Sequence, residues 1–423
     1  MKTKYLLIGA GISNLTFANY AKKDYLIVEK EAEVGGYCRT IMRNDYVWDY
    51  AGHFFHFKTE EFKKNFLNKV PKEDIITQEK NTKIIFDKNL LVDYPFQTNI
   101  HQLEKEDFID CLYDLFNKEE KDNYDNFLDM LYGKFGKSIT EKFLKPYNEK
   151  LYAIDLTKLD TDAMGRFFPY ANKEQIINNM KKAKNDSYNN SFLYLKKGAE
   201  EFIQILYNNI DKNKLLLNTK IVKIDKDNKI ATTDKGEKIE YEYLINTSPL
   251  NNFLELFEEE KYKKLREELS YNKVLVFNLG FNKKGNLTKE HWLYIPSKDC
   301  NYYRIGFYDN ILSADKLSMY IEIGYSKDDK IDDAEIEEQL KLTLENLRKQ
   351  EIIDDETELV DYEPIVMSPA YVHIETNTDK KIKKEFENFK KDNIYSIGRY
   401  GSWTYCSMED CMLQAKELYE KIK

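Results

Sequence analysis

Two glycines and one acidic residue near the N-terminus have the spacing of a dinucleotide-binding turn. Gly9 and Gly11 follow a largely apolar stretch at 4–8, Lys-Tyr-Leu-Leu-Ile, and precede a helical pattern at 12–21. Glu29 lies 18 positions after Gly11. Glycines let the backbone approach a pyrophosphate, a helix N-terminus attracts its negative charge, and the acid binds the ribose hydroxyls. This chemistry predicts a βαβ unit that binds a dinucleotide.

A second glycine pair, Gly35-Gly36, follows the acid and favours FAD over a nicotinamide cofactor. The third glycine of the fingerprint is replaced by Asn14, and we therefore expect the helix to stand slightly away from the strand. An ordinary glycine turn in an α/β protein is the alternative. The candidate cofactor contacts are Gly9, Gly11, Ile12, Ser13, Glu29, Lys30, Gly36, Tyr37, Arg39, Gly52 and Val222, the last expected near the adenine.

Arginine is scarce in this chain, because seven of the 65 basic residues are arginine and the other 58 are lysine. A guanidinium is a planar, permanently charged, bidentate donor, so arginine should be kept where that geometry is needed. The scarcity makes the arginines site candidates, except Arg266 and Arg348, which lie in charge-rich helical patterns and are expected on the surface.

The elements that must position these residues alternate between strands and helices. Short apolar strands are predicted to form one sheet, the stretch from 60 to 150 is largely helical, and alternating strands between 274 and 323 predict an antiparallel sheet. The fold class is α/β, with a Rossmann-like FAD-binding domain, an inserted helical domain and an antiparallel β-sheet substrate domain. The expected boundaries are 1–60, 190–248 and 390–423 for the discontinuous FAD-binding domain, 61–189 for the mostly helical substrate or lid domain, and 249–389 for the sheet domain. Residues 172–190 are either a mobile flap or a surface helix and loop.

Composition excludes several classes of protein. The net charge of -9 and the pI near 5.4 argue against a nucleic-acid or anionic-membrane partner. No apolar run approaches the roughly 20 residues of a membrane span, and no signal peptide pattern is present, so a cytoplasmic protein is expected. The five cysteines lack a CxxC pattern and the five histidines are scattered, which predicts a reducing compartment and no metal site.

Several short stretches together resemble the UDP-galactopyranose mutase family, flavoenzymes that interconvert the pyranose and furanose rings of nucleotide sugars. The matching stretches run nearly from end to end of the chain and are 9–36, 94–99, 146–150, 292–296 with Tyr303-Arg304, and 398–405. The first is common to many flavoproteins, whereas the other four together are fairly specific.

The resemblance implies roles for particular residues, each of which has a core, turn or surface role as its alternative. The implied base and ribose contacts are Tyr94, Gln97, Asn148 and Tyr152, the last standing where the family usually has tryptophan. The implied diphosphate clamp is Arg166, Arg304, Tyr294 and Tyr405. The implied neighbours of the sugar and the flavin are His53, Asn189 and Arg399, of which Arg399 would stabilise the anionic reduced flavin.

One departure from the family concerns the sugar. Family members usually offer an aspartate or asparagine to the sugar hydroxyls just after Tyr405, and here the candidate is Glu409. The substrate is therefore expected to be a nucleotide-diphosphate sugar, with galactose, another hexose, a deoxysugar or a heptose left open.

The resemblance also implies a mechanism and a setting. N5 of reduced FAD would attack the anomeric carbon, and the resulting sugar adduct would open and reclose as the other ring, without net redox change. An external reductant such as NAD(P)H or a flavodoxin-type donor would keep the flavin reduced. The product would serve cell-surface polysaccharide synthesis, and a homodimer is left open.

Two other functions compete with the mutase. The first is an FAD-dependent oxidase or desaturase of the amine-oxidase or protoporphyrinogen-oxidase type, which would need an apolar or amine-binding cavity rather than a diphosphate clamp. The second is a flavin-binding scaffold without chemistry.

Overall fold

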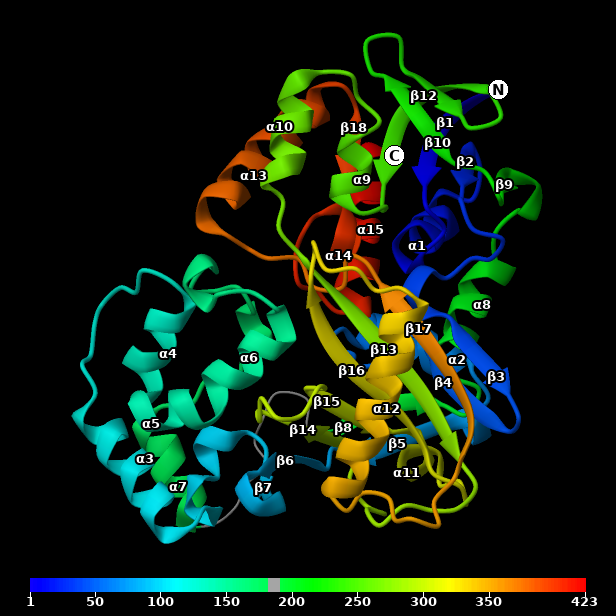
Figure 1. Ribbon diagram of the computed structural model, residues 1–423. Helices are drawn as coiled ribbons and strands as arrows, with labels where there is room; N and C mark the ends of the chain where they lie inside the picture. Colours follow the sequence, from blue (N-terminus) through cyan, green and yellow to red (C-terminus); the bar gives the residue numbers. More distant parts are fainter. Residues whose placement is uncertain (182–190) are drawn as a thin grey trace.

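The computed structural model describes residues 1–181 and 191–423 of the chain and contains two seven-stranded sheets with a helical region beside them (Figure 1). The first sheet lies at the top right of the view, the second at the lower right, and the helical region at the lower left. Within the described residues, no helix is both long enough and apolar enough to cross a membrane.

The first sheet carries the N-terminal βαβ unit. Its path is β10-β11-β12-β1-β2-β9, and β18 pairs in parallel with β12. β1 pairs in parallel with both β12 and β2, whereas the hairpin β10-β11 is antiparallel. The strands are β1 (Lys2–Ile8), β2 (Tyr25–Val28), β9 (Leu215–Leu216), β10 (Ile221–Asp225), β11 (Ile230–Thr233), β12 (Lys238–Asn246) and β18 (Ile394–Ser396). The prediction that short apolar strands form one sheet is confirmed.

Three helices distant in sequence pack together beside this sheet: α1 (Ile12–Ala21), α8 (Glu200–Asn208) and α15 (Met408–Ile422). Their apolar side chains bury one face, and helices α9 (Leu250–Leu254), α10 (Glu260–Glu268) and α13 (Thr376–Lys391) contribute to a second core with strand residues of the sheet. Parallel strands covered on both faces are continuously apolar, which explains the runs at 4–8 and 25–28.

The second sheet has the order β17-β13-β16-β15-β14-β6-β7 and is antiparallel except where β14 pairs with β6. Its strands are β6 (Thr82–Phe86), β7 (Leu90–Asp93), β13 (Asn272–Phe281), β14 (Trp292–Tyr294), β15 (Arg304–Phe307), β16 (Ser318–Ser326) and β17 (Leu359–Met367). The predicted antiparallel platform is confirmed. The extended interruption of the helical stretch forms β6 and β7, which continue this platform.

The helical region contributes one wall of the site through α6 (Lys145–Tyr152). It also contains α3 (Lys105–Asn117), α4 (Phe127–Phe135), α5 (Lys137–Ile139) and α7 (Lys173–Lys181). The remaining elements include α2 (Glu60–Lys69), α11 (Tyr308–Leu312), α12 (Asp333–Lys349), α14 (Gly398–Gly401) and the pairs β3-β4 (Thr40–Arg43, Tyr46–Asp49) and β5-β8 (Ile75–Glu79, Ser191–Leu195). The segment 172–190, for which the sequence leaves open both a flap and a surface helix and loop, contains α7, and its residues 182–190 lie outside the described residues.

Candidate active site

A cavity of about 720 Å³ runs from the glycine turn after β1 to the aromatic end of the second sheet. It is lined by α1, by the ends of β1 and β2, by β14, β15 and β16, by α6 and by the segment 398–411. Segments far apart in the sequence therefore share one cavity.

The glycine turn leaves room for a phosphate group. Gly11 has φ -78° and ψ 178°, and a β-carbon built on it would meet no atom within 4 Å. No side chain caps the N-terminus of α1, and its first turn contains no acidic residue. A β-carbon built on Gly36 would have one neighbour within 4 Å, the Gly11 α-carbon at 3.8 Å. The open space and the uncapped helix N-terminus fit the pyrophosphate of a dinucleotide.

Glu29 lies at the end of β2, on the same side of the cavity. Its buried carboxylate accepts hydrogen bonds from the backbone N–H groups of Ala10 at 2.7 Å and Glu31 at 3.0 Å. These bonds fix the glycine turn relative to the carboxylate, which is the position expected for a ribose-binding acid.

Asn14 connects the helix to the strand directly. Its amide nitrogen donates to the carbonyls of Ile8 and Gly9, each at 2.9 Å, and contacts Thr247 Oγ1 at 3.1 Å. The side chain is fully buried. From the sequence, we expect the helix to stand away from the strand, an expectation that does not consider these hydrogen bonds. The Asn14 amide connects the helix to the carbonyls at the end of the strand, where a glycine would allow close backbone packing.

The middle of the cavity contains His53 and Arg399. The His53 Nδ1 atom lies 2.8 Å from the Ala51 carbonyl, and burial, together with the charges of Arg399 and Arg304, lowers its pKa to about 4. His53 is therefore neutral at physiological pH. The Arg399 guanidinium donates to the Cys406 carbonyl at 3.2 Å and lies 4.3 Å from the centre of the Tyr405 ring.

Gly52 lies against two of the protein's own rings. A β-carbon there would lie 2.2 Å from the Tyr320 hydroxyl and 2.6 Å from Phe54. Gly52 thus permits the close approach of two of the protein's own rings, and it lines the cavity as well.

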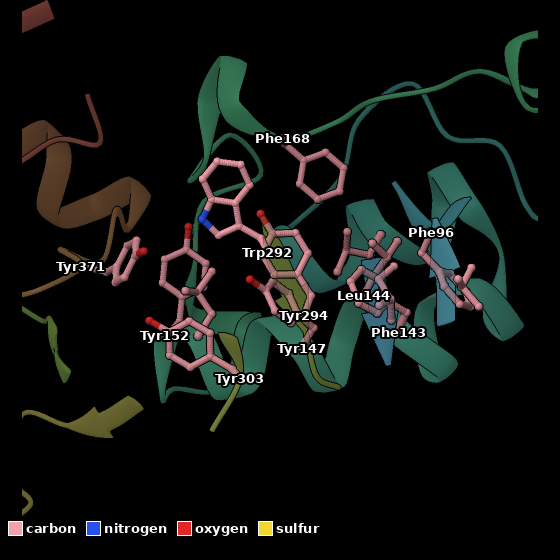
Figure 2. Close-up of a cluster of buried hydrophobic side chains, with 14 of the residues drawn as sticks. Phe96, Phe143, Leu144, Tyr147, Tyr152, Phe168, Trp292, Tyr294, Tyr303 and Tyr371 are labelled. Carbon is pink, nitrogen blue, oxygen red and sulfur yellow. The ribbon is translucent and has the colours of Figure 1, made fainter. Parts of the chain in front are cut away.

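Three tyrosines from different elements form the far end of the cavity. The rings of Tyr94 and Tyr294 meet edge to face at 4.7 Å, and the rings of Tyr147 and Tyr294 lie 5.2 Å apart. Figure 2 shows Tyr147 on α6 beside Tyr294 on β14, with Trp292 close by. Phenol and indole rings present flat apolar faces with polar edges, an arrangement suited to a base or a sugar.

Arg304 lies on β15 at this end of the cavity. One guanidinium nitrogen is 2.6 Å from each carboxylate oxygen of Glu322 and 3.2 Å from the Tyr371 hydroxyl. The Tyr303 hydroxyl also donates to Glu322, at 2.5 Å. The Nε atom of Arg304 is buried and has no hydrogen-bond partner among the described residues. A donor without a partner in a cavity wall is available to a ligand.

The structure brings most of the predicted residues to this cavity. Those that line it are Gly9, Gly11, Ile12, Ser13, Glu29, Lys30, Gly36, Tyr37, Arg39, Gly52, His53, Tyr94, Tyr294, Arg304, Arg399 and Tyr405.

Three predicted base and ribose contacts do not reach it. Asn148 donates to the Leu144 carbonyl at 2.6 Å, Gln97 donates to the Pro169 carbonyl, and Tyr152 is buried in the core of the helical region. The reason on α6 is helical periodicity, because Tyr147 and Leu151 face the cavity, whereas Asn148 and Tyr152, one position later, face the core.

Two predicted substrate contacts have partners within the protein. Arg166 forms an ion pair with Asp410 in the first turn of α15 and does not line the cavity. Glu409 is buried, and its two oxygens accept hydrogen bonds from the backbone N–H groups of Lys58 at 2.9 Å and Thr59 at 2.8 Å. Glu409 therefore anchors the chain before α2, and its expected contact with the sugar stays a prediction that these two bonds do not support.

Two further candidates remain. Val222 is 44% exposed at an irregularity of β10, where the register with β11 shifts, and its neighbour Ile221 lines the cavity instead. Asn189 lies outside the described residues.

Sequence reasoning missed Tyr147 and Lys80, which both line the cavity. The Lys80 ammonium lies 5.6 Å from the centre of the Tyr94 ring and 5.5 Å from that of Trp292, and it has no carboxylate partner among the described residues. Burial, and after it the charge of Arg304, lowers its pKa to about 8. Nothing in the sequence distinguishes Lys80 from the other lysines. Tyr147, in contrast, could have been preferred to Asn148, because Tyr147 lies on the same face of the helix as Leu151.

The fold and the cavity define a flavin-binding protein with a dinucleotide cradle and a polar aromatic end. Residues 14–417 match the family of flavin containing amine oxidoreductases, and the chain belongs to that family. The family match identifies the cofactor class as a flavin.

The chain is similar in structure to reduced UDP-galactopyranose mutase, with a TM-score of 0.92, 22% identity, and coverage of 100% of this chain and 94% of that one. It is also similar to a putative protoporphyrinogen oxidase from Exiguobacterium sp. 255-15, with a TM-score of 0.77, 15% identity, and coverage of 99% and 98%. These likenesses confirm the predicted fold class and the fold that the sequence resemblance implied.

A curated relative, protoporphyrinogen oxidase of Dictyostelium discoideum, is 29% identical over 164 residues. The match covers 37% of this chain and spans 29% of the length of that relative.

Proposed function

We propose that the protein is an FAD-dependent mutase that interconverts the pyranose and furanose forms of a nucleoside diphosphate sugar. The observation that carries the proposal is the polar end of the flavin cavity, where Arg304, Lys80 and the three tyrosines 94, 147 and 294 meet. An amine gives these cations little to bind, whereas a diphosphate uses them directly.

The substrate's base and ribose are assigned to the aromatic end, between Tyr94, Tyr147 and Tyr294. The diphosphate is assigned to Arg304 and to Lys80. Because Arg304 is already paired with Glu322, its positive charge is largely neutralised, and its main contribution is a directed N–H donor. Lys80 supplies a charge with no carboxylate partner among the described residues.

The sugar is assigned to the middle of the cavity, near His53 and Trp292. Neutral His53 donates through Nδ1 to a backbone carbonyl, which leaves Nε2 as an acceptor for a sugar hydroxyl. Reduced flavin supplies the nucleophile when it is bound. The protein's residues hold the leaving diphosphate in place while the sugar changes its ring size.

The test compares oxidised and reduced protein. We expect the dithionite-reduced protein, offered a panel of pyranose and furanose nucleotide sugars, to convert one into the other without consuming stoichiometric reductant. The oxidised protein should be inactive. Separation of the isomers by ion-exchange chromatography, with the flavin absorbance followed in parallel, measures both expectations.

An oxidase is the second candidate, because the family and two of the similar proteins bear oxidase names. An oxidase would turn over in its oxidised form with air and release one hydrogen peroxide for each two-electron oxidation of its substrate. Peroxide release with a porphyrinogen or an amine, combined with no isomerisation in the panel, would replace the mutase with the oxidase.

Lys80 provides a prediction specific to this cavity. Lys80→Met should weaken nucleoside diphosphate binding by about 1.5–3 kcal/mol, the typical value of a hydrogen bond to a charged group. Wild-type affinity should fall roughly tenfold between pH 7 and pH 9, because free Lys80 loses its proton near pH 8 whereas the bound anion favours the protonated form. Lys80→Met should abolish most of this pH dependence, as measured by isothermal titration calorimetry.

Lys83 is a matched control. It lies on β6, does not line the cavity and forms an ion pair with Asp93. Lys83→Met should leave affinity and pH dependence unchanged. Equal losses in the two variants would show that the overall charge of the region, rather than Lys80 itself, attracts the diphosphate.

A further inference from the structure

Two cysteines on the cavity wall form a pair that the proposed mutase reaction does not use. Cys406 and Cys411 are both buried, both line the cavity, and their sulfur atoms are 3.5 Å apart. Cys406 precedes the N-cap of α15, and Cys411 lies in its first turn. A disulfide has a sulfur–sulfur distance of about 2 Å, so side-chain rotation by a small amount would be needed to join them.

The local structure holds the two thiols against each other. Ser407 caps α15, its hydroxyl and the Asp410 carboxylate form a reciprocal capping box, and the Cys411 N–H donates to the Ser407 carbonyl at 3.1 Å. The segment between the two cysteines is thus hydrogen-bonded to itself. Their proximity follows from the helix cap.

The surroundings shift the pKa values of the two thiols in opposite directions. The contact with Cys406, followed by the Arg399 backbone N–H, the Ser13 hydroxyl and the Arg399 charge, stabilises a Cys411 thiolate, so the pKa of Cys411 is lowered despite its burial. The hydrogen bond to Cys411, followed by burial, raises the pKa of Cys406. Cys411 is the nucleophile of the pair, and Cys406 is the proton-bearing partner.

We propose that Cys406 and Cys411 are a redox-active dithiol, which small disulfides oxidise to an intramolecular disulfide on the wall of the flavin cavity. The Cys411 thiolate attacks one sulfur of the small disulfide, whose S–S bond breaks and releases one thiolate. Cys406, after giving its proton to that thiolate, attacks the Cys411 sulfur and expels the second thiolate, which takes a proton from water. The pair loses two electrons and the Cys406 proton, and the small disulfide gains these together with one proton from water.

The other cysteines lack this arrangement. Cys38 also lines the cavity, but burial raises the pKa of its thiol. Cys111 and Cys300 are buried in other clusters, and burial raises their pKa values too, that of Cys111 to about 12. These three thiols serve as internal references.

Oxidation of the pair would also affect Arg399, because the Arg399 guanidinium donates to the Cys406 carbonyl. Closing the disulfide moves the residue that orients this guanidinium. Thiol oxidation and flavin environment are therefore coupled, and the coupling is reciprocal.

The sequence makes the experiment direct. Residues 400–416 contain both cysteines and lie between Arg399 and Lys416 without another lysine or arginine, so trypsin releases them as one peptide. The purified, flavin-loaded protein is equilibrated in mixtures of 2-mercaptoethanol and 2-hydroxyethyl disulfide. It is then quenched with acid, denatured, alkylated with iodoacetamide, digested and measured by mass spectrometry.

We expect this peptide to lose two hydrogens and escape alkylation as the mixture becomes more oxidising, while the Cys111 and Cys300 peptides stay alkylated. Cys411→Ser should leave Cys406 alkylated at every ratio, and Cys300→Ser should behave as wild type. Alkylation of both Cys406 and Cys411 at every ratio, or a stable adduct with mercaptoethanol in place of the internal disulfide, would overturn the proposal. No nucleotide sugar is used, so the outcome is independent of the mutase reaction.

Discussion

Arg304→Ala is expected to weaken nucleoside diphosphate binding by about 2–5 kcal/mol, because it removes a directed donor from a buried site. Arg304→Lys should keep the charge but lose the guanidinium geometry, and should recover only part of the affinity. Flavin content should be unchanged in both variants. Calorimetric titration with a nucleoside diphosphate measures the affinity, and flavin absorbance of the unfolded protein measures the cofactor.

Arg304→Ala should also affect stability, and the loss of stability must be distinguished from the loss of affinity. Arg304 neutralises Glu322, which is buried, so Arg304→Ala leaves an unpaired carboxylate and should destabilise the fold by about 3–5 kcal/mol. The double variant Arg304→Ala/Glu322→Gln removes that charge and should regain stability without regaining affinity. Arg43, which pairs with Asp361 and Glu363 at the surface, is the matched control, and Arg43→Ala should bind as wild type does. Affinity of the double variant within twofold of wild type would remove Arg304 from the diphosphate site.

Gly11→Val is expected to abolish flavin binding and leave the protein folded. The extended backbone at Gly11 accepts any residue without strain, and its β-carbon would point into open space. That space fits the cofactor's pyrophosphate, so the valine side chain competes with the cofactor rather than with the protein. We expect the purified variant to be colourless.

Circular dichroism separates this outcome from misfolding. The helix content of Gly11→Val should match that of wild-type protein stripped of flavin, and its thermal unfolding should lie close to that of the stripped protein. Gly11→Ala should still bind flavin but with lower affinity than wild type, since the alanine side chain is smaller than that of valine. A yellow Gly11→Val protein with normal flavin content would place the pyrophosphate elsewhere in the cavity.

The sequence alone was sufficient for the cofactor cradle and for the fold class. The cradle residues from Gly9 to Arg39 are close in the chain, and their roles depend on the backbone of one strand, one turn and one helix. Local spacing is enough to predict such a unit. The arginine scarcity also pointed to Arg39, Arg304 and Arg399, which line the cavity. It pointed equally to Arg43 and Arg166, which do not.

The tertiary structure alone decided which side of each element faces the site. Asn148 and Tyr147 are neighbours on α6, yet only Tyr147 lines the cavity, and a similar one-residue difference separates Val222 from Ile221. Lys80 and the pair Cys406 and Cys411 become site residues because distant segments meet around one cavity. Sequence spacing determines local geometry, but the direction of a side chain depends on which partner surface its element packs against, and that is a property of the whole fold.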